Sequence, residues 1–412
     1  NDEDEMEAPA ELIEISKSVS LDSEWNKKIG SDNNFGRLVP AFSNDTIIHI
    51  SSNGYLVAID SDSGLVLWTI QTEDLVSGAV TVGFKKIFYG TLDGDLVALD
   101  FKDGAEIWRS QVSSEILSPP VTNGSIVAAQ TSDGKITGFN IKTGELKWVH
   151  QNSIPKLTLR GTATPILAKG FIFTGFANGK VSMIYPDSGA IRLEIPVTIN
   201  EGKSELDRVV DVDGKSVVSN DVLVSASYQG NITAIDLQKG QIAWQEKISS
   251  VHDLVSVRSR IIAIDEKDSI KAFGLLTGAI LWQQDGLKLR GVSSPAALGN
   301  NIAIGDFDGY IHLLNTETGS IEGRAQITSS VPVGKNIHSI GEDKILGADE
   351  DGNVFYLQIN NISDETVEDT NDEKNELQED SSEATEAVTN EMCDVDEGDI
   401  RNKGNKKRQN CY

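Results

Sequence analysis

The chain has 412 residues, a formal net charge of −27 and only two cysteines. So acidic a composition argues against a nucleic-acid-binding protein, because phosphates attract basic surfaces. Cys393 and Cys411 both lie near the C-terminus, so the rest of the chain has no cysteine with which to form a disulfide framework.

Both ends of the chain are polar and acidic. The first eleven residues carry six acids and no bases, and we expect residues 1–18 to be a flexible acidic tether. Residues 360–412 are acidic and almost free of aromatic side chains, which predicts a disordered acidic tail. A regulatory or docking role for that tail stays open as an alternative.

Between these ends a short motif recurs. In its first copy an apolar stretch ends at Asp60, a turn closes at Gly64, and Trp68 follows four residues later. The Asp can bond its own backbone and start a turn, the Gly supplies a positive φ, and the Trp offers a flat surface to a neighbouring unit. Further copies end at Trp108, Trp148, Trp244 and Trp282, whereas Leu193 and Gly323 take the Trp position in two weaker copies.

A second landmark precedes each copy and gives the repeat period. It falls at Gly54, Gly94, Gly134, Gly179, Gly230, Asp268, Gly309 and Gly352. The successive spacings are 40, 40, 45, 51, 38, 41 and 43 residues. Eight units of about this length, with strand and turn signals and no helical periodicity, are typical of four-stranded propeller blades. The sequence therefore predicts an all-β fold, an eight-bladed β-propeller, over residues 19–359.

The last unit is incomplete in a way that predicts how the ring closes. Residues 354–359 form an apolar strand, but no Gly and Trp follow them. The missing strand is found near the N-terminus, at residues 21–25, where it ends with Trp25. We expect this N-terminal strand to pair with the last blade, so that no open edge remains. All six Trp residues then have one structural role.

Two consecutive units are longer than the others, and their extra residues follow Trp148 and Leu193. Connections of this kind emerge on one face of a propeller, where functional loops usually lie. The first loop contains Leu157, Leu159 and Arg160, a plausible anchor cluster for a protein partner. The alternative is that both Leu are tucked under the loop and Arg160 is solvated. The second loop contains Asp211 and Asp213, which could pair with Arg160 or receive a cationic group of a partner.

Signals for catalysis or metal binding are weak. Asp211 and Asp213 have the spacing of calcium ligands, but no third and fourth ligand follow at loop spacing. The five His are scattered without a zinc pattern, and no phosphate loop or serine nucleophile motif stands out. We therefore predict no catalytic residue, no metal and no cofactor.

The repeat resembles the tryptophan-docking motif of quinoprotein-type eight-bladed propellers, which include quinone-dependent dehydrogenases and non-enzymatic members. Three stretches, 155–161, 206–213 and 230–244, are similar to those of the BamB family, lipoproteins of the outer-membrane β-barrel assembly machinery. The resemblance covers about residues 19–359 and leaves the acidic tail outside the family pattern.

This resemblance implies a non-enzymatic periplasmic scaffold, held at the outer membrane by a lipidated Cys upstream of Asn1. It implies binding to the POTRA repeats of BamA and to other members of the complex, and assistance to the insertion of β-barrel proteins. Direct contact with unfolded outer-membrane proteins is a further expectation. The residues it implies for partner binding are Leu157, Leu159, Arg160, Asp211 and Asp213.

Two other functions stay open. A quinone-dependent (PQQ) dehydrogenase on the same fold would need a quinone, Ca²⁺ and commonly a pair of adjacent Cys, and the sequence has no such pair. A general peptide- or polysaccharide-binding propeller would need a groove lined by aromatic side chains, but nearly every Trp is assigned to blade packing.

Overall fold

The computed structural model describes residues 7–30, 37–153, 163–198 and 210–362. The chain divides into residues 1–362 and residues 363–412, and the second unit, with the predicted tail, lies outside the described residues. The described residues form 32 strands and no helix. They therefore contain no helix that could cross a membrane.

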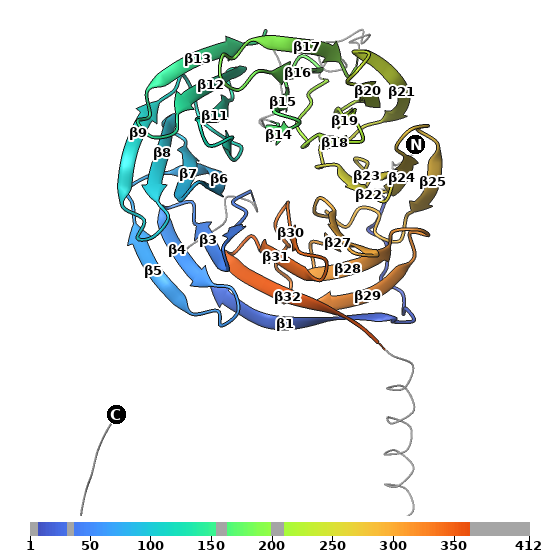
Figure 1. Cartoon of the computed structure of the whole chain (residues 1–412). Coiled ribbons are helices and arrows are strands. Elements are labelled where there is room, and N and C mark those ends of the chain that lie inside the picture. Colours follow the sequence, from blue (N-terminus) through green and yellow to red (C-terminus); the bar gives the residue numbers. More distant parts are fainter. Residues whose placement is uncertain (1–6, 31–36, 154–162, 199–209, 363–412) are drawn as a thin grey trace, which may run out of the picture. The chain divides into compact units, whose positions relative to one another are not determined.

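The strands form eight antiparallel sheets of four, arranged as the blades of a closed ring (Figure 1). Blades one to four are β2 (Ala41–Ser43), β3 (Thr46–Ile50), β4 (Tyr55–Asp60) and β5 (Val66–Gln71); β6 (Val76–Gly83), β7 (Lys86–Thr91), β8 (Asp95–Asp100) and β9 (Glu106–Gln111); β10 (Val121–Thr122), β11 (Ile126–Thr131), β12 (Lys135–Asn140) and β13 (Leu146–Gln151); β14 (Ile166–Ala168), β15 (Phe171–Gly175), β16 (Lys180–Ile184) and β17 (Ile191–Pro196). Blades five to eight are β18 (Val217–Ser219), β19 (Val222–Ala226), β20 (Gly230–Asp236) and β21 (Gln241–Ile248); β22 (Val255–Val257), β23 (Arg260–Ile264), β24 (Ile270–Gly274) and β25 (Ile280–Gln284); β26 (Ala296–Leu298), β27 (Asn301–Gly305), β28 (Tyr310–Asn315) and β29 (Ile321–Gln326); β30 (His338–Ile340), β31 (Lys344–Ala348), β32 (Asn353–Asn361) and β1 (Val19–Lys28). The predicted eight-bladed propeller is confirmed.

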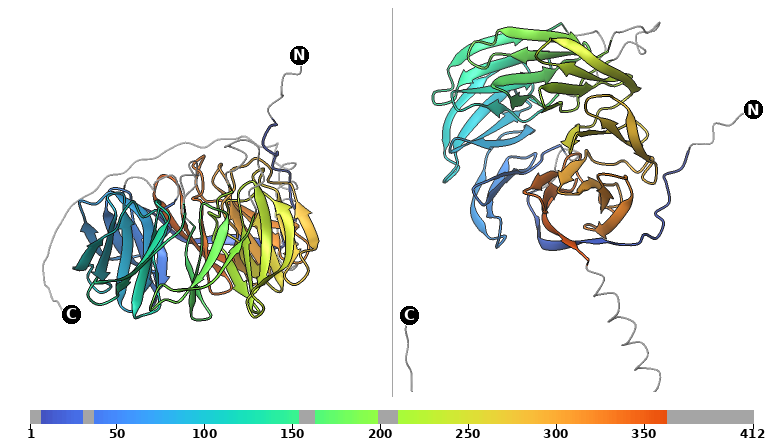
Figure 2. Two further views of the ribbon diagram at one scale, coloured as in Figure 1. Left: turned by 90° about the horizontal axis from the view of Figure 1, so that it is seen from above. Right: turned by 45° about the vertical axis from the view of Figure 1, so that its right-hand side comes forward.

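The ring is closed by the strand that the sequence analysis assigned to the last blade. β1 pairs antiparallel with β32, from Val19 opposite Asn361 to Lys28 opposite Asn353, with Trp25 opposite Tyr356. The first strand in sequence is therefore the outermost strand of blade eight (Figure 1). In the view from above, the blades stand side by side around the ring (Figure 2).

The turn that closes each repeat is built as its residue types require. Ser63 donates its backbone N–H to Oδ1 of Asp60 at 2.9 Å, and Gly64 donates to the Asp60 carbonyl at 2.9 Å. Gly64 has a φ of 65°, which favours glycine over residues with a Cβ. Asp236 accepts the equivalent bond from the N–H of Lys239, and Asn140 accepts it from the N–H of Thr143.

Each repeat Trp meets the turn of the next blade. A Cβ added to Gly104 would lie 2.9 Å from the Trp68 ring, and one added to Gly278 would lie 2.7 Å from Trp244. The indole N–H groups donate to carbonyls of the following blade at 2.6–3.1 Å, namely Trp25 to Ser61, Trp108 to Ile141, Trp148 to Pro186, Trp244 to Leu275 and Trp282 to Thr316. The repeat motif thus links one blade to the next.

Gly323, which stands at a Trp position of the repeat, leaves room for the start of β1. A Cβ on Gly323 would lie 2.8 Å from Val19 Cγ2 and 2.8 Å from the Val19 carbonyl. The start of β1 therefore passes directly over this glycine as the chain crosses from blade seven to blade eight.

Candidate partner-binding site

Of the five residues expected to bind a partner, the structure places two. Leu157, Leu159 and Arg160 lie outside the described residues. Asp211 and Asp213 belong to the segment that leads from blade four into β18, the innermost strand of blade five. The geometry of the candidate site therefore rests on these two carboxylates and their surroundings.

The segment around Asp211 is fastened to both neighbouring blades. The Asp211 carbonyl accepts the N–H of Tyr228 at 2.9 Å, and Val212 donates its N–H to the Phe176 carbonyl at 3.4 Å. The Val212 side chain covers Gly175 so closely that a Cβ there would lie 2.3 Å from it. Asp211 itself is 0 % exposed, so a partner docking on this surface cannot reach its carboxylate.

Asp213 lies differently from Asp211, because it lines a cavity of about 550 Å³. Most of the residues that line this cavity precede the innermost strands of different blades, so the cavity lies on the axis of the ring. They include Arg37 ahead of blade one, Asp213 ahead of blade five, Asp253 ahead of blade six and Lys335 ahead of blade eight. The central cavity is thus bounded by several blades at once.

The wall of the central cavity carries both kinds of charge. Arg37 and Lys335 come from blades one and eight, which are neighbours in the ring. Asp213, Asp253 and Asp268 come from blades five and six, and Glu350 comes from blade eight, as Lys335 does. A wall of this kind can receive a polar protein segment that carries both kinds of charge, because it offers both cations and carboxylates.

Burial raises the pKa values of two carboxyl groups in the cavity. Burial, with a further contribution from Asp211, raises the pKa of Asp213 to about 7, although Arg37 and Lys335 oppose the shift. Burial raises the pKa of Asp253, whose Oδ1 accepts the N–H of Lys215 at 2.8 Å. Asp213 therefore changes its charge in the neutral pH range, where a carboxyl group in water would stay ionised.

The pKa values of a histidine and a lysine in the cavity are lowered. Burial and, to a lesser extent, Lys335 lower the pKa of His252 to about 4. Its Nε2 lies 4.0 Å from Oδ1 of Asp268, beyond hydrogen-bond reach. Burial and Arg37 lower the pKa of Lys335. Among the described residues there is no group of three or more His, Cys, Asp or Glu side chains that could hold a metal ion.

The sequence analysis missed Arg37, His252 and Lys335. These residues share no motif, since the segments that connect the blades differ in length and composition. Their common property is position: each comes shortly before an innermost strand. Aligning the repeats on the innermost strands, instead of on the Gly and Trp landmarks, would have brought the three residues close together, because Arg37 lies four residues before its strand and His252 and Lys335 lie three before theirs.

Comparison with known proteins gives the family. The family model described as outer membrane protein assembly factor BamB matches residues 52–284 and 253–389, most of the chain. This chain belongs to the BamB family. The outer membrane protein assembly factor BamB of Pseudomonas aeruginosa is 47 % identical over 323 residues, which cover 78 % of this chain and 85 % of the relative.

Solved structures agree with the BamB assignment. The crystal structure of BamB from Moraxella catarrhalis matches with a TM-score of 0.74 and 28 % identity, covering 81 % of this chain and all of that chain. The quinohemoprotein alcohol dehydrogenase of Comamonas testosteroni matches with a TM-score of 0.66 but only 12 % identity, over 83 % of this chain and 76 % of that one. The second likeness concerns the fold alone.

Proposed function

We propose that this protein is an outer membrane protein assembly factor that acts as a rigid scaffold for protein partners. The observation that carries the proposal is the match of the BamB family model across most of the chain, on a fold that the BamB crystal structure shares. A closed ring of eight blades suits this role, because it holds the connecting segments of neighbouring blades in fixed positions. An assembly factor of this kind acts by binding and not by catalysis.

The finer proposal concerns the partner and the site. The partner is the set of POTRA repeats of BamA, together with the other members of the assembly complex, and Leu157, Leu159, Arg160 and Asp213 make the contact. Asp211 supports the contact from beneath, because it is buried in the segment that carries Asp213. The location is the periplasmic face of the outer membrane, with a lipid on a Cys upstream of Asn1.

A titration of the POTRA repeats against the full chain tests this proposal. We expect Arg160→Ala to weaken binding about tenfold or more, the size typical of a central interface residue, and Asp213→Asn to weaken it severalfold. Arg192→Ala and Asp187→Asn are matched controls, since both residues are exposed in blade four, and neither should change the affinity. Unchanged binding by both test variants would remove the site assignment.

A further inference from the structure

The N-terminal segment does not leave the propeller freely where β1 begins. Residues 7–18, here called the strap, run along blades six and seven before they enter β1 of blade eight. Ala10 donates its N–H to the Lys288 carbonyl at 2.9 Å, and Ser18 donates to the Glu322 carbonyl at 3.0 Å. The strap is therefore bonded at both ends to segments of blades six and seven.

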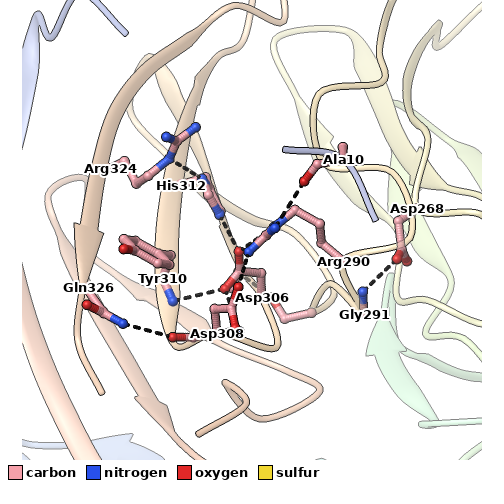
Figure 3. Close-up of polar contacts among 12 residues, drawn as sticks. Ala10, Asp268, Arg290, Gly291, Asp306, Asp308, Tyr310, His312, Arg324 and Gln326 are labelled. Atoms are coloured by element: carbon pink, nitrogen blue, oxygen red, sulfur yellow. Dashed lines mark hydrogen bonds and ion pairs between the residues drawn. The ribbon is translucent and has the colours of Figure 1, made fainter. Parts of the chain in front are cut away.

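Arg290 holds the strap at Ala10 from a buried position. Its Nη1 donates to the Ala10 carbonyl at 3.0 Å, while Nε donates to Asp306 at 2.8 Å and Nη2 to Asp308 at 2.6 Å (Figure 3). The guanidinium also lies 4.7 Å from the centre of the Phe307 ring. Arg290 is only 5 % exposed with the strap in place, and its bonds to Asp306 and Asp308 orient the guanidinium from the propeller side.

Arg324 supplies a second fixed donor. Its Nη1 donates to the Ile13 carbonyl at 3.0 Å, and its Nε donates to Nδ1 of His312 at 3.0 Å. Nε2 of His312 lies 2.9 Å from Oδ2 of Asp306, the carboxylate that also receives Arg290 (Figure 3). One buried network thus aims two guanidinium groups at backbone carbonyls three residues apart.

Two lysines and an apolar contact complete the surface beneath the strap. Glu7 lies 3.0 Å from Lys267 Nζ and 4.0 Å from Lys288 Nζ. Leu12 packs against the apolar cluster between blades six and seven that includes Leu287. We call the surface formed by Lys267, Leu287, Lys288, Arg290 and Arg324 the strap site.

Most residues of the strap are exposed. The N–H groups of Ala10 and Ser18 and the carbonyls of Ala10, Ile13 and Ser18 are bonded to the propeller. The side chains of Glu11, Ile13 and Glu14 are exposed, and Ile13 is 72 % exposed. Segments with few buried apolar contacts open at low free energy. The strap site itself stays formed when the strap leaves, because Asp306, Asp308 and His312 hold its arginines.

We propose that the strap site is a binding site for extended acidic peptides, and that residues 7–18 are its resident, detachable occupant. Recognition through backbone carbonyls requires an extended ligand, and the contacts of Leu12 and Glu7 favour an apolar and an acidic side chain at these two positions. The charge of Arg290 is balanced by Asp306 and Asp308. Lys267 and Lys288, which face Glu7 of the strap, and Arg324 add further positive charge on a chain with a net charge of −27, and so favour acidic ligands. A partner segment of this chemistry binds by displacing the strap. This inference does not depend on the proposed assembly function.

The test uses the full chain and a fluorescently labelled peptide of residues 5–18 as the probe, followed by anisotropy at low salt. In a variant with Ala10→Pro and Leu12→Asp in the strap, the peptide should bind at least tenfold more tightly than in the unchanged chain. The unchanged chain binds the peptide weakly because its own strap competes at an effective concentration in the millimolar range. Raising the salt concentration should weaken binding.

Two variants and one control peptide decide whether the binding occurs at the strap site. Adding Arg324→Ala to the strap variant should weaken peptide binding at least fivefold, whereas adding Arg192→Ala, on blade four, should not. A scrambled peptide of the same composition should bind at least tenfold more weakly than the native one. The proposal would be overturned if the peptide bound equally to the unchanged chain and to the strap variant, or if the scrambled peptide bound as well as the native one. It would also be overturned if the peptide did not bind to a folded strap variant. If Arg324→Ala does not fold, a peptide with Leu12→Asp gives the same test on an unaltered propeller, and undiminished binding of that peptide would equally overturn it.

Discussion

The indole of Trp25 lies directly on the backbone of Gly64, and its Nε1 donates to the Ser61 carbonyl at 2.8 Å. Trp25 belongs to blade eight and Gly64 to blade one, so this contact joins the two ends of the ring. A Cβ at position 64 would lie 2.8 Å from Trp25 Cγ. The closure of the propeller therefore depends on a glycine that has both a positive φ and no side chain.

Gly64→Ala should destabilise the protein more than an alanine at another glycine of similar conformation. The matched control is Gly170→Ala, because Gly170 has a φ of 78° but nothing within 4 Å of its added Cβ. We expect about 1 kcal/mol for the control, from backbone strain alone. Gly64→Ala should lower the free energy of unfolding by about 2–4 kcal/mol, because Trp25 must also move. Urea unfolding of both variants measures the difference, and equal losses would show that the Trp25 contact contributes little.

His49 should make the protein sensitive to acid. It is 0 % exposed in β3, neither ring nitrogen has a hydrogen-bond partner among the described residues, and burial lowers its pKa to about 4. The unfolded chain therefore takes up a proton below pH 6.5 that the folded chain refuses until about pH 4. Stability falls as the pH decreases through this window, by roughly 3 kcal/mol in all from this group. His49→Leu should flatten the pH profile of unfolding between these values, and an unchanged slope would contradict the assignment.

Acid should also loosen the strap at Ile13. His312 faces Asp306, Arg290, Arg324 and Tyr310, and burial lowers its pKa although Asp306 opposes the shift. Because Arg324 donates to Nδ1, the docked state requires a neutral ring, and a proton at Nδ1 would break that bond. Arg324 is then no longer held toward the Ile13 carbonyl, so docking is favoured while the ring is neutral and weakens as the pH falls and the ring takes up a proton.

Hydrogen exchange of the strap measures this effect. The protection factor of the Ala10 amide, corrected for intrinsic exchange, should decrease on acidification in the unchanged chain. His312→Gln keeps a neutral side chain with one donor and one acceptor, so its protection factor should vary less with pH. A similar decrease in both proteins would assign the loosening to another group.

Partner binding should depend on pH through Asp213. Burial raises the pKa of this carboxyl group to about 7, so it is mostly protonated at pH 6 and mostly charged at pH 8. If the charged form meets a cation of the partner, affinity for the POTRA repeats should increase severalfold over this interval. Asp213→Asn should bind weakly with little dependence on pH in the same titration. A dependence that persists in this variant would point to a different group.

The fold could be predicted because its determinants repeat. The spacing from Asp60 to Gly64 to Trp68 reflects a turn and a packing contact that every blade needs, so the sequence states it several times. The pairing of β1 with β32 could be predicted for the same reason, since the last repeat lacks a Trp strand that Trp25 supplies.

The site was less predictable because its residues do not repeat. The Asp-x-Asp spacing does not reveal that Asp211 is enclosed between blades four and five whereas Asp213 faces the central cavity. Arg37 and Lys335 are about 300 residues apart and meet only through ring closure. The strap has the composition of a tether. Its docking could not be predicted, because Arg290 and Arg324 bind backbone carbonyls of the strap, and every sequence has such carbonyls.

The most direct test of the assembly-factor account is the folding rate of a β-barrel protein in membranes that contain the remaining members of the assembly complex. Adding this chain should raise the rate at which the barrel becomes resistant to protease, and an equal amount of Arg160→Ala should raise it less. A rate that does not change when the unaltered chain is added and bound would contradict the account.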